Sequence, residues 1–274
     1  MYTTFYHLKE NPFNVTSDPS FLFMSQAHRE ALSFLTYGIT QRKGFLEITG
    51  EIGTGKTTLC KALLNRLDAR IKTALVINPD LSELQLLESI AEDFGIELPK
   101  KTNKLTIFRM LNKFLIHQLS LGNNVVLIID EAQNLKPTLL EQIRLLSNLE
   151  TEKEKLIQIA LVGQPQLRDK LNSPSLTQLR QRISVRYHIR PLDRRELGDY
   201  IQHRLRVAGS DGREIFMEAA LDEIYAFSAG VPRLINMICD RALLYGFVLE
   251  SPTIDKDVIV RAVQEIKGLI YEHN

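Results

Sequence analysis

Residues 50–57 read Gly50-Glu51-Ile52-Gly53-Thr54-Gly55-Lys56-Thr57 and match the pattern G-x-x-x-x-G-K-[ST] at every fixed position. This stretch follows a short apolar run, 45–49, and precedes a helix-like run that begins at Thr58. A strand, a glycine-rich turn and a helix in this order are the context in which the pattern binds phosphate groups. The sequence therefore predicts a phosphate-binding loop.

The residue types of this loop suit the chemistry of a nucleoside triphosphate. Glycines let backbone N–H groups turn inward around phosphate oxygens, and the N-terminus of the following helix adds partial positive charge. We expect Lys56 to neutralise the β- and γ-phosphates and the Thr57 hydroxyl to bind Mg²⁺. The expected nucleotide-binding residues of the loop are Gly50, Glu51, Ile52, Gly53, Thr54, Gly55, Lys56, Thr57 and Thr58.

An acidic pair, Asp130 and Glu131, directly follows the apolar run 125–129. ATP bound with Mg²⁺ requires an acidic contact to the metal, and its hydrolysis requires a group that orients water. We expect Asp130 to hold the Mg²⁺ shell, directly or through water, and Glu131 to polarise the attacking water. Because Glu131 is present, the sequence favours hydrolysis over nucleotide binding alone.

Five short runs rich in β-branched residues alternate with stretches whose apolar residues lie three or four apart. This alternation implies right-handed crossovers and a parallel sheet. The predicted strands are 45–49, 73–77, 125–129, 157–162 and 185–189, and the helix-like stretches between them include 84–94 and 105–119. The predicted fold class is α/β, a five-stranded parallel sheet with helices on both faces.

After Pro191 the strand pattern stops, and helical spacing continues over 197–207, 217–228, 233–249 and 256–268. Capping residues mark the ends of these helices: Asp193 and Asp255 as N-caps, Gly209 and Gly230 at C-termini, and Pro232 in a first turn. We therefore expect an α/β nucleotide-binding core with an N-terminal strap at 1–191, followed by a small all-helical lid domain at 192–274.

The composition is that of an ordinary globular protein, with 34 Lys and Arg against 33 Asp and Glu and 44% hydrophobic residues among 274. It excludes a disordered chain and a disulfide scaffold. The longest aliphatic run falls far short of the ~20 residues of a membrane-spanning helix. The first residues lack a secretory signal, and the separate Cys60 and Cys239 fit a reducing compartment. We expect a cytoplasmic protein.

Further motifs run along almost the whole chain. Beside the phosphate loop, they are 5–13, 18–23, Leu161-Val162-Gly163-Gln164-Pro165, 179–183, 200–209 and Gly230-Val231-Pro232-Arg233. Together they resemble the AAA+ ATPases of the ASCE class. More narrowly, the chain resembles the ATPase modules of the ExeA/GspA (general secretion pathway protein A) type and the MshM (MSHA pilus biogenesis) type. Transposition ATPases of the TniB/TnsC type share many of these features.

The resemblance implies roles for further residues of the core. Gln164 stands where a sensor 1 residue lies between the water and the γ-phosphate, although Asn, Thr or Ser is usual there. Arg182, or else Arg180, matches the arginine finger that reaches the nucleotide of a neighbouring subunit. An alternative for both arginines is an ordinary surface or ion-pair role.

The resemblance also implies roles outside the sheet. Arg233 matches the sensor 2 arginine of the lid, which reports the nucleotide state. Pro12 and Phe13 resemble a segment that packs beside the adenine, and a hydrophobic strap on the core is the equal alternative. ATP and Mg²⁺ are the implied cofactors.

An arginine finger acting in trans implies a homo-oligomer, either a ring or an arc. The resemblance implies an ATPase that drives assembly of a secretion or type IV pilus-like envelope machine together with an inner-membrane or envelope partner. Secretion-type relatives continue with a membrane helix and a periplasmic wall-binding domain, and this sequence stops at Asn274 with neither. Either it is part of a longer protein, or it is a separate form like the pilus type.

Nine arginines lie between Arg180 and Arg213, against four acidic residues. They support the alternative function, a DNA-binding AAA+ regulator of transposition that recruits a transposase. We favour the other interpretation, subunit-interface and solvated arginines, because Tyr187 and Tyr200 are the only aromatic residues of the segment. DNA is therefore the less favoured partner.

The histidines show no spacing to carboxylates or cysteines that is typical of a metal site. We interpret them as ordinary surface or core residues. They are His7, His28, His117, His188, His203 and His273.

Overall fold

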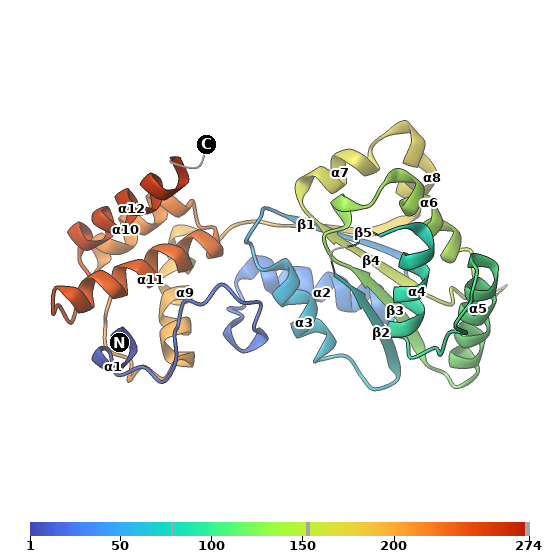
Figure 1. The fold of residues 1–274 in the computed structure, drawn as a ribbon, viewed down its shortest axis with the longest axis horizontal. Coiled ribbons are helices and arrows are strands. Elements are labelled where there is room, and N and C mark those ends of the chain that lie inside the picture. The colour runs from blue at the N-terminus through green and yellow to red at the C-terminus, as the bar shows by residue number, and fades with distance from the viewer. Residues whose placement is uncertain (78, 80, 152–153, 272–274) are drawn as a thin grey trace. The chain divides into compact units, whose positions relative to one another are not determined.

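The computed structural model describes residues 1–77, 79, 81–151 and 154–271, and Figure 1 traces its helices and strands. The chain divides into two compact units. The helical unit comprises Met1–His28, Glu51–Thr58 and Arg190–Asn274, and the α/β unit comprises Arg29–Gly50 and Leu59–Ile189. The N-terminal segment and the phosphate loop therefore group with the C-terminal helices.

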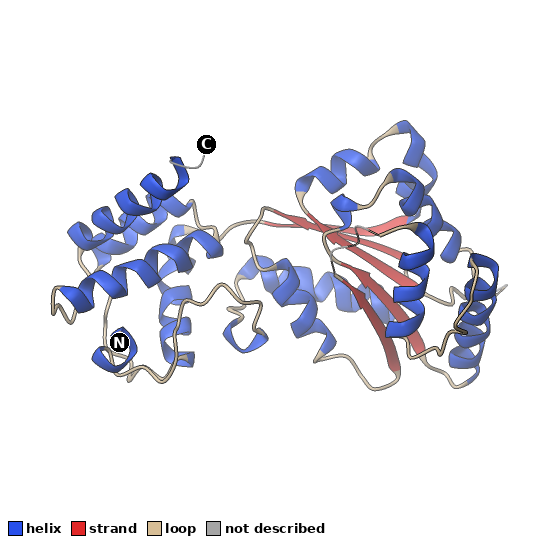
Figure 2. Ribbon diagram, in the orientation of Figure 1, coloured by secondary structure: helices blue, strands red, loops and turns tan. Residues whose placement is uncertain are grey.

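A five-stranded parallel sheet forms the centre of the α/β unit (Figure 2), in the order β2-β3-β4-β1-β5. Strands β1, β3 and β4 are buried at every position, as parallel strands covered on both faces require. The strands are β1 (Phe45–Gly50), β2 (Ile71–Val76), β3 (Asn124–Ile129), β4 (Gln158–Gly163) and β5 (Ile183–Ile189).

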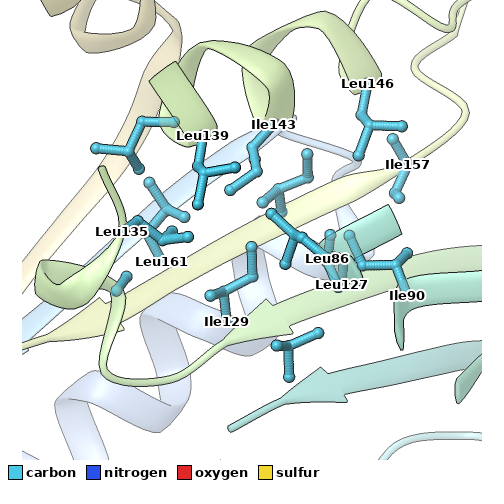
Figure 3. Close-up of a cluster of buried hydrophobic side chains, with 14 of the residues drawn as sticks. Leu86, Ile90, Leu127, Ile129, Leu135, Leu139, Ile143, Leu146, Ile157 and Leu161 are labelled. Carbon is cyan, nitrogen blue, oxygen red and sulfur yellow. The ribbon is translucent and has the colours of Figure 1, made fainter. Parts of the chain in front are cut away.

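Helices cover the sheet on both faces. On one face, Leu86 and Ile90 of α4 and Ile143 of α6 pack against Leu127 and Leu161 of the strands (Figure 3). On the other face α2 lies so close to β1 that a Cβ on Gly38 would meet a side-chain carbon of Leu46 at 2.2 Å. The helices are α2 (Gln26–Thr40), α3 (Lys56–Leu64), α4 (Glu83–Asp93), α5 (Lys104–Ser120), α6 (Pro137–Leu146), α7 (Pro165–Leu171) and α8 (Thr177–Arg182).

The predicted fold class is confirmed, since each predicted strand appears within two residues of its predicted bounds. The sequence did not predict the strand order, because hydrophobic periodicity carries no information about which strands are neighbours. The order places the carboxyl ends of β3, β4 and β1 next to one another. Asp130, Gln164 and Glu51 are the residues that follow these three strands.

Four α-helices form most of the helical unit: α9 (Arg194–Val207), α10 (Glu218–Ser228), α11 (Pro232–Val248) and α12 (Lys256–Tyr271). Asp193 and Glu196 form a capping box at the start of α9, and the Asp255 carboxylate accepts from the N–H of Val258 near the start of α12. Pro232 is the first residue of α11. These polar caps satisfy N–H groups that have no partner within a helix.

The N-terminal segment contributes a short helix α1 (Tyr2–Phe5) and a 3-10 turn η1 (Pro19–Phe21). Tyr6 and Phe13 are buried in one hydrophobic cluster with apolar residues of α9 to α12. The buried Arg204 fixes the backbone of the segment, because its guanidinium donates to the carbonyls of Pro12 at 2.5 Å and Asn14 at 3.0 Å. These contacts explain why the first 28 residues group with the helical unit.

Candidate nucleotide-binding and catalytic site

The phosphate loop connects the end of β1 to the start of α3 and adopts a conformation that depends on glycine. Gly53 has φ +81° and Gly55 has φ +89°, values that side chains other than glycine rarely adopt. Lys56 is the first residue of α3, and Thr57 lies in its first turn. The loop therefore presents the start of a helix, where N–H groups are available to anions.

Within the loop, the Glu51 carbonyl is a common acceptor. It receives the Thr54 hydroxyl at 2.8 Å and the Lys56 ammonium at 2.8 Å. Lys56 is only 5% exposed. A bound phosphate would offer this ammonium a charged acceptor, which forms a stronger hydrogen bond than a neutral carbonyl.

Two other residues of the helical unit contact two further carbonyls of the loop, those of Gly53 and Thr54. The backbone N–H of Arg233, at the start of α11, donates to the Gly53 carbonyl at 3.2 Å. Nε2 of His28 lies 2.9 Å from the Thr54 carbonyl. A Cβ on Gly53 would lie 2.5 Å from the Cβ of Arg233, so the close approach of α11 requires glycine at this position. Arg233, the predicted sensor 2 residue, thus contacts the phosphate loop through its backbone.

The acidic pair lies in the α/β unit, directly after β3. Asp130 is completely buried, and its carboxylate accepts from the N–H of Glu131 at 2.9 Å. Glu131 has φ +52°, in the left-handed region, which costs about 1–2 kcal/mol for a residue with a side chain. The turn at the end of β3 therefore holds Glu131 in a conformation that the chain would not adopt without support.

Two glutamine amides provide contacts to Glu131. Nε2 of Gln133 lies 2.5 Å and Nε2 of Gln164 lies 3.2 Å from the same carboxylate oxygen, Oε2. The two glutamines are also connected, because the Gln164 N–H donates to the Gln133 side-chain carbonyl at 3.0 Å. Oε1 of Glu131 has no hydrogen-bond partner among the residues that the structure describes. This oxygen is thus available to accept a proton.

Gln133 is a site residue that the sequence analysis missed. A Cβ on Gly163 would lie 2.6 Å from its side-chain oxygen, so the end of β4 needs glycine where the Gln133 amide packs. The Lys170 ammonium donates to the backbone carbonyls of Gln133 and Leu135 and fixes the turn. The available sequence signal was an amide side chain two residues after Glu131. The direction in which this side chain points depends on the conformation of the turn, which the sequence does not give.

The two arginine-finger candidates differ in their surroundings. The Arg182 guanidinium donates to the Ser147 hydroxyl at 2.9 Å and to the Asn148 side chain at 2.5 Å. In the described part of the chain, no hydrogen bond or ion pair engages the Arg180 guanidinium. The carbonyl of Arg180 accepts from the guanidinium of Arg186 at 3.2 Å. Arg182 is thus bound within its own unit, whereas the Arg180 guanidinium has no partner among the described residues.

The adenine candidates Pro12 and Phe13 are buried in the helical unit. Phe13 is 1% exposed and contacts the ring of Phe216 edge to face, with centroids 6.0 Å apart. The Pro12 carbonyl is bound by Arg204. These contacts favour the alternative of a hydrophobic strap, which packs on the helical unit.

A buried carboxylate, Glu47, lies within β1 and was not singled out by the sequence. It is 1% exposed, and its oxygens lie 3.3 Å from Nε of Arg186 and 3.9 Å from Nε of Arg168 without accepting a hydrogen bond. Burial raises the pKa of Glu47 above its ordinary value, and the two arginines only partly offset this effect. Arg168 lies one helical turn beyond Gln164, on α7.

Among the described residues, no group of three or more His, Cys, Asp or Glu side chains could hold a metal ion. In the same part of the chain, none of the helices has both the length and the apolar character needed to cross a bilayer.

Comparison with known proteins identifies relatives of this chain. Residues 39–171 match the family model of the AAA domain. General secretion pathway protein A of Aeromonas hydrophila is 43% identical over 269 residues, which cover 98% of this chain and 49% of that protein. The chain therefore spans about half the length of this curated relative.

Solved structures share the fold at low sequence identity. The Aeropyrum pernix ORC2 protein in its ADPNP-ADP complexes has a TM-score of 0.69 at 17% identity, covering 94% of this chain and 72% of its own. Cdc6p from Pyrobaculum aerophilum has a TM-score of 0.64 at 19% identity, covering 90% and 70%. The fold, the AAA domain and the secretion relative agree. The chain therefore contains an AAA domain and is similar over 98% of its length to part of general secretion pathway protein A.

Proposed function

We propose that this protein hydrolyses ATP with Mg²⁺ and that Glu131 is the general base. The phosphate loop binds the triphosphate, with Lys56 as the neutralising cation. The Thr57 hydroxyl and the Asp130 carboxylate are hard oxygen donors, the ligand type that Mg²⁺ prefers. Bound Mg²⁺ would supply charge neutralisation at the phosphates.

The reaction is an in-line displacement by water. The water oxygen bonds to the γ-phosphorus, the bond from phosphorus to the β–γ bridging oxygen breaks, and ADP and inorganic phosphate form. Glu131 accepts the proton that the water loses, with Oε1 as the accepting atom, because Oε2 already accepts from both glutamine amides. Gln164 is the proposed sensor 1 residue, since its amide contacts the base.

One observation carries this proposal: Glu131 has a left-handed backbone conformation, and its carboxylate accepts from two side-chain amides. The test is Glu131→Gln, which keeps size and polarity but removes the base. We expect ATP binding to persist and turnover to fall by about 10²–10⁴-fold. Parental turnover in this variant would show that Glu131 is not the base.

We further propose that a homo-oligomer, a ring or an arc, is the active form. A finger residue must reach a neighbouring nucleotide, and Arg180 is the better candidate because Arg182 already binds Ser147 and Asn148. Steady-state ATPase activity should therefore rise more than proportionally with protein concentration. Activity strictly proportional to concentration down to nanomolar protein would count against an oligomeric site.

The proposed work of the ATPase is assembly of a secretion or pilus-like envelope machine. Its support is the 43% identity to general secretion pathway protein A, of which this chain covers about half. We propose that the protein acts at the cytoplasmic face of the inner membrane through an envelope partner. The ATPase activity measured with and without inner-membrane vesicles tests this, and stimulation by the vesicles is expected.

Regulation of transposition on DNA remains the second candidate, supported by the arginines between Arg180 and Arg213. Several of these are already engaged: Arg204 is buried, and Arg194 pairs with Glu218 and Asp222. ATPase assays with duplex DNA at low and moderate salt separate the two functions. Strong, salt-sensitive stimulation would favour the DNA-bound regulator, and no response would favour the envelope machine.

A further inference from the structure

His28 is a buried histidine at the start of α2, 3% exposed and far in sequence from the phosphate loop. Its Nε2 lies 2.9 Å from the Thr54 carbonyl. Its Nδ1 lies 2.6 Å from the Ser25 hydroxyl. A Cβ on Gly55 would lie 3.1 Å from Nε2, so the ring packs directly on the loop backbone. Both ring nitrogens therefore have defined partners.

These partners determine the protonation of the ring. A carbonyl can only accept, so Nε2 must carry a proton. In the neutral ring Nδ1 is then an acceptor, and the Ser25 hydroxyl is its donor. Burial lowers the pKa of His28 below its ordinary value, against smaller opposing effects of Thr54 and the Glu196 carboxylate. The neutral Nε2–H tautomer is thus the form that matches the structure.

The hydrogen bond to Thr54 also orients the next N–H group of the loop. A trans peptide unit is planar, and its carbonyl and N–H point in opposite directions. Because His28 binds the Thr54 carbonyl on one side, the Gly55 N–H of the same peptide unit points away from the ring. Backbone N–H groups of such a loop are the groups that contact phosphate oxygens.

The segment around His28 is itself anchored to α9. The N–H of Gln26 donates to the Glu196 carboxylate at 2.8 Å, and Glu196 belongs to the capping box with Asp193. The Ser25 hydroxyl accepts from the N–H of His28 at 3.2 Å. The ring is therefore held by a turn that is hydrogen-bonded to the first turn of α9.

We propose that His28 is a positioning residue of the nucleotide site, which aims the Gly55 N–H at a phosphate of the bound nucleoside triphosphate. The role rests on the proposed function, because it requires that the loop binds nucleotide. It differs from a packing role in one respect: it depends on a donor at the Nε2 position and not on the volume of the ring.

The test compares two amide substitutions that differ in reach. The Gln side-chain amide extends as far as Nε2, whereas the Asn amide extends only to the level of Nδ1. We expect His28→Gln to bind ATP within about three-fold of the parent and His28→Asn to bind roughly ten-fold more weakly, the effect of one lost hydrogen bond to a charged group. Binding is measured by calorimetry with ATP and Mg²⁺ in the Glu131→Gln background.

Equal ATP affinity of the two variants, or tighter binding by His28→Asn, would overturn the proposal. Ser25→Ala gives an independent measurement, since it leaves the ring in place but removes the hydroxyl that orients Nδ1. We expect it to weaken ATP binding by about three-fold, and unchanged binding would also count against the proposal. The exposed His117 provides the control, because His117→Gln should leave ATP binding unaltered.

These outcomes remain distinct from failure of the proposed function. If the parent protein neither binds nor hydrolyses ATP, the function is wrong. If the parent binds ATP and the His28 variants bind it equally well, only the role of His28 is wrong.

Discussion

Nε2 of Gln164 lies 3.2 Å from Oε2 of Glu131, so the residue after β4 contacts the acidic turn after β3. The contact follows from the strand order, in which β3 and β4 are neighbours and end at the same edge. Gln133 connects the same two residues, because its side chain donates to Glu131 and accepts from the N–H of Gln164. The three residues therefore form one hydrogen-bonded set.

The first prediction concerns Gln133. Gln133→Ala removes one donor to Glu131 and the acceptor of the Gln164 N–H, so the carboxylate of the proposed base loses its orientation. We expect kcat to fall about 10- to 100-fold, as when a group that orients a functional ligand is removed. The KM for ATP should stay within about two-fold, since Gln133 lies outside the phosphate loop. Steady-state kinetics measure both.

The exposed Gln41 supplies the matched control, and Gln41→Ala should have parental kinetics. If Gln133→Ala turns over ATP at the parental rate, the amide contacts do not orient the base. If KM rises while kcat stays constant, Gln133 contributes to binding instead.

The sequence could predict the elements of this fold because their signals are local. Hydrophobic periodicity identified all five strands, and the glycine pattern of 50–57 identified the loop. The left-handed glycines Gly53 and Gly55 fit that pattern. Such features depend only on residues a few positions apart.

The remaining features depend on contacts between distant segments. His28 lies 26 residues before Thr54 in sequence, and its spacing has no motif. Arg180 and Arg182 have the same chemistry and nearly the same position, so only the contacts of Arg182 with Ser147 and Asn148 separate them. Packing between distant segments decides these roles, and the local sequence does not predict that packing.

The second prediction separates these two arginines by mixing subunits. Arg180→Ala subunits keep an intact nucleotide site but lack the proposed finger, whereas Glu131→Gln subunits keep the finger but lack the base. We expect Arg180→Ala to lose about 10³-fold or more in ATPase rate, in the range of arginine fingers. A mixture of the two variants should be more active than either alone.

Arg182→Ala should behave differently, because its guanidinium binds Ser147 and Asn148 in its own chain. We expect it to lower the free energy of unfolding by about 1–2 kcal/mol, with no gain in activity on mixing with Glu131→Gln. If Arg182→Ala is the variant rescued by mixing, the two assignments must be exchanged.

The third prediction concerns Glu47 and pH. Its raised pKa means that the folded protein holds this proton more tightly than the unfolded chain. The free energy of unfolding therefore falls as the pH rises from 4.5, the ordinary pKa of a glutamate, through the raised pKa of Glu47 in the folded protein. Glu47→Gln lacks this titration, so its free energy of unfolding relative to the parent should improve from pH 4 to pH 7. Urea unfolding at several pH values measures the difference.

The loss of Glu47 should not leave a costly unpaired charge, because the side chains of Arg168 and Arg186 are 48% and 40% exposed. Water can therefore solvate both guanidinium groups in the variant. A stability difference between Glu47→Gln and the parent that is constant from pH 4 to pH 7 would contradict the raised pKa.

The fourth prediction concerns Gly230, which precedes α11 and the Arg233 contact. It has φ +77°, and a Cβ there would lie 1.9 Å from the carbonyl oxygen of Leu192. The Gly230 carbonyl accepts from the N–H of Leu192 at 2.9 Å, so the two backbones cannot separate without losing a hydrogen bond. We expect Gly230→Ala to lower the free energy of unfolding by about 3 kcal/mol or more.

Gly95 is the matched control for this effect. Its φ of +74° is nearly the same, but no atom lies within 4 Å of a Cβ built there. Gly95→Ala therefore incurs only the cost of the left-handed backbone, about 1–2 kcal/mol. Equal losses in the two variants, measured by urea unfolding, would show that backbone conformation alone explains Gly230. A larger loss in Gly230→Ala would show that close contact with Leu192 is what requires glycine before α11.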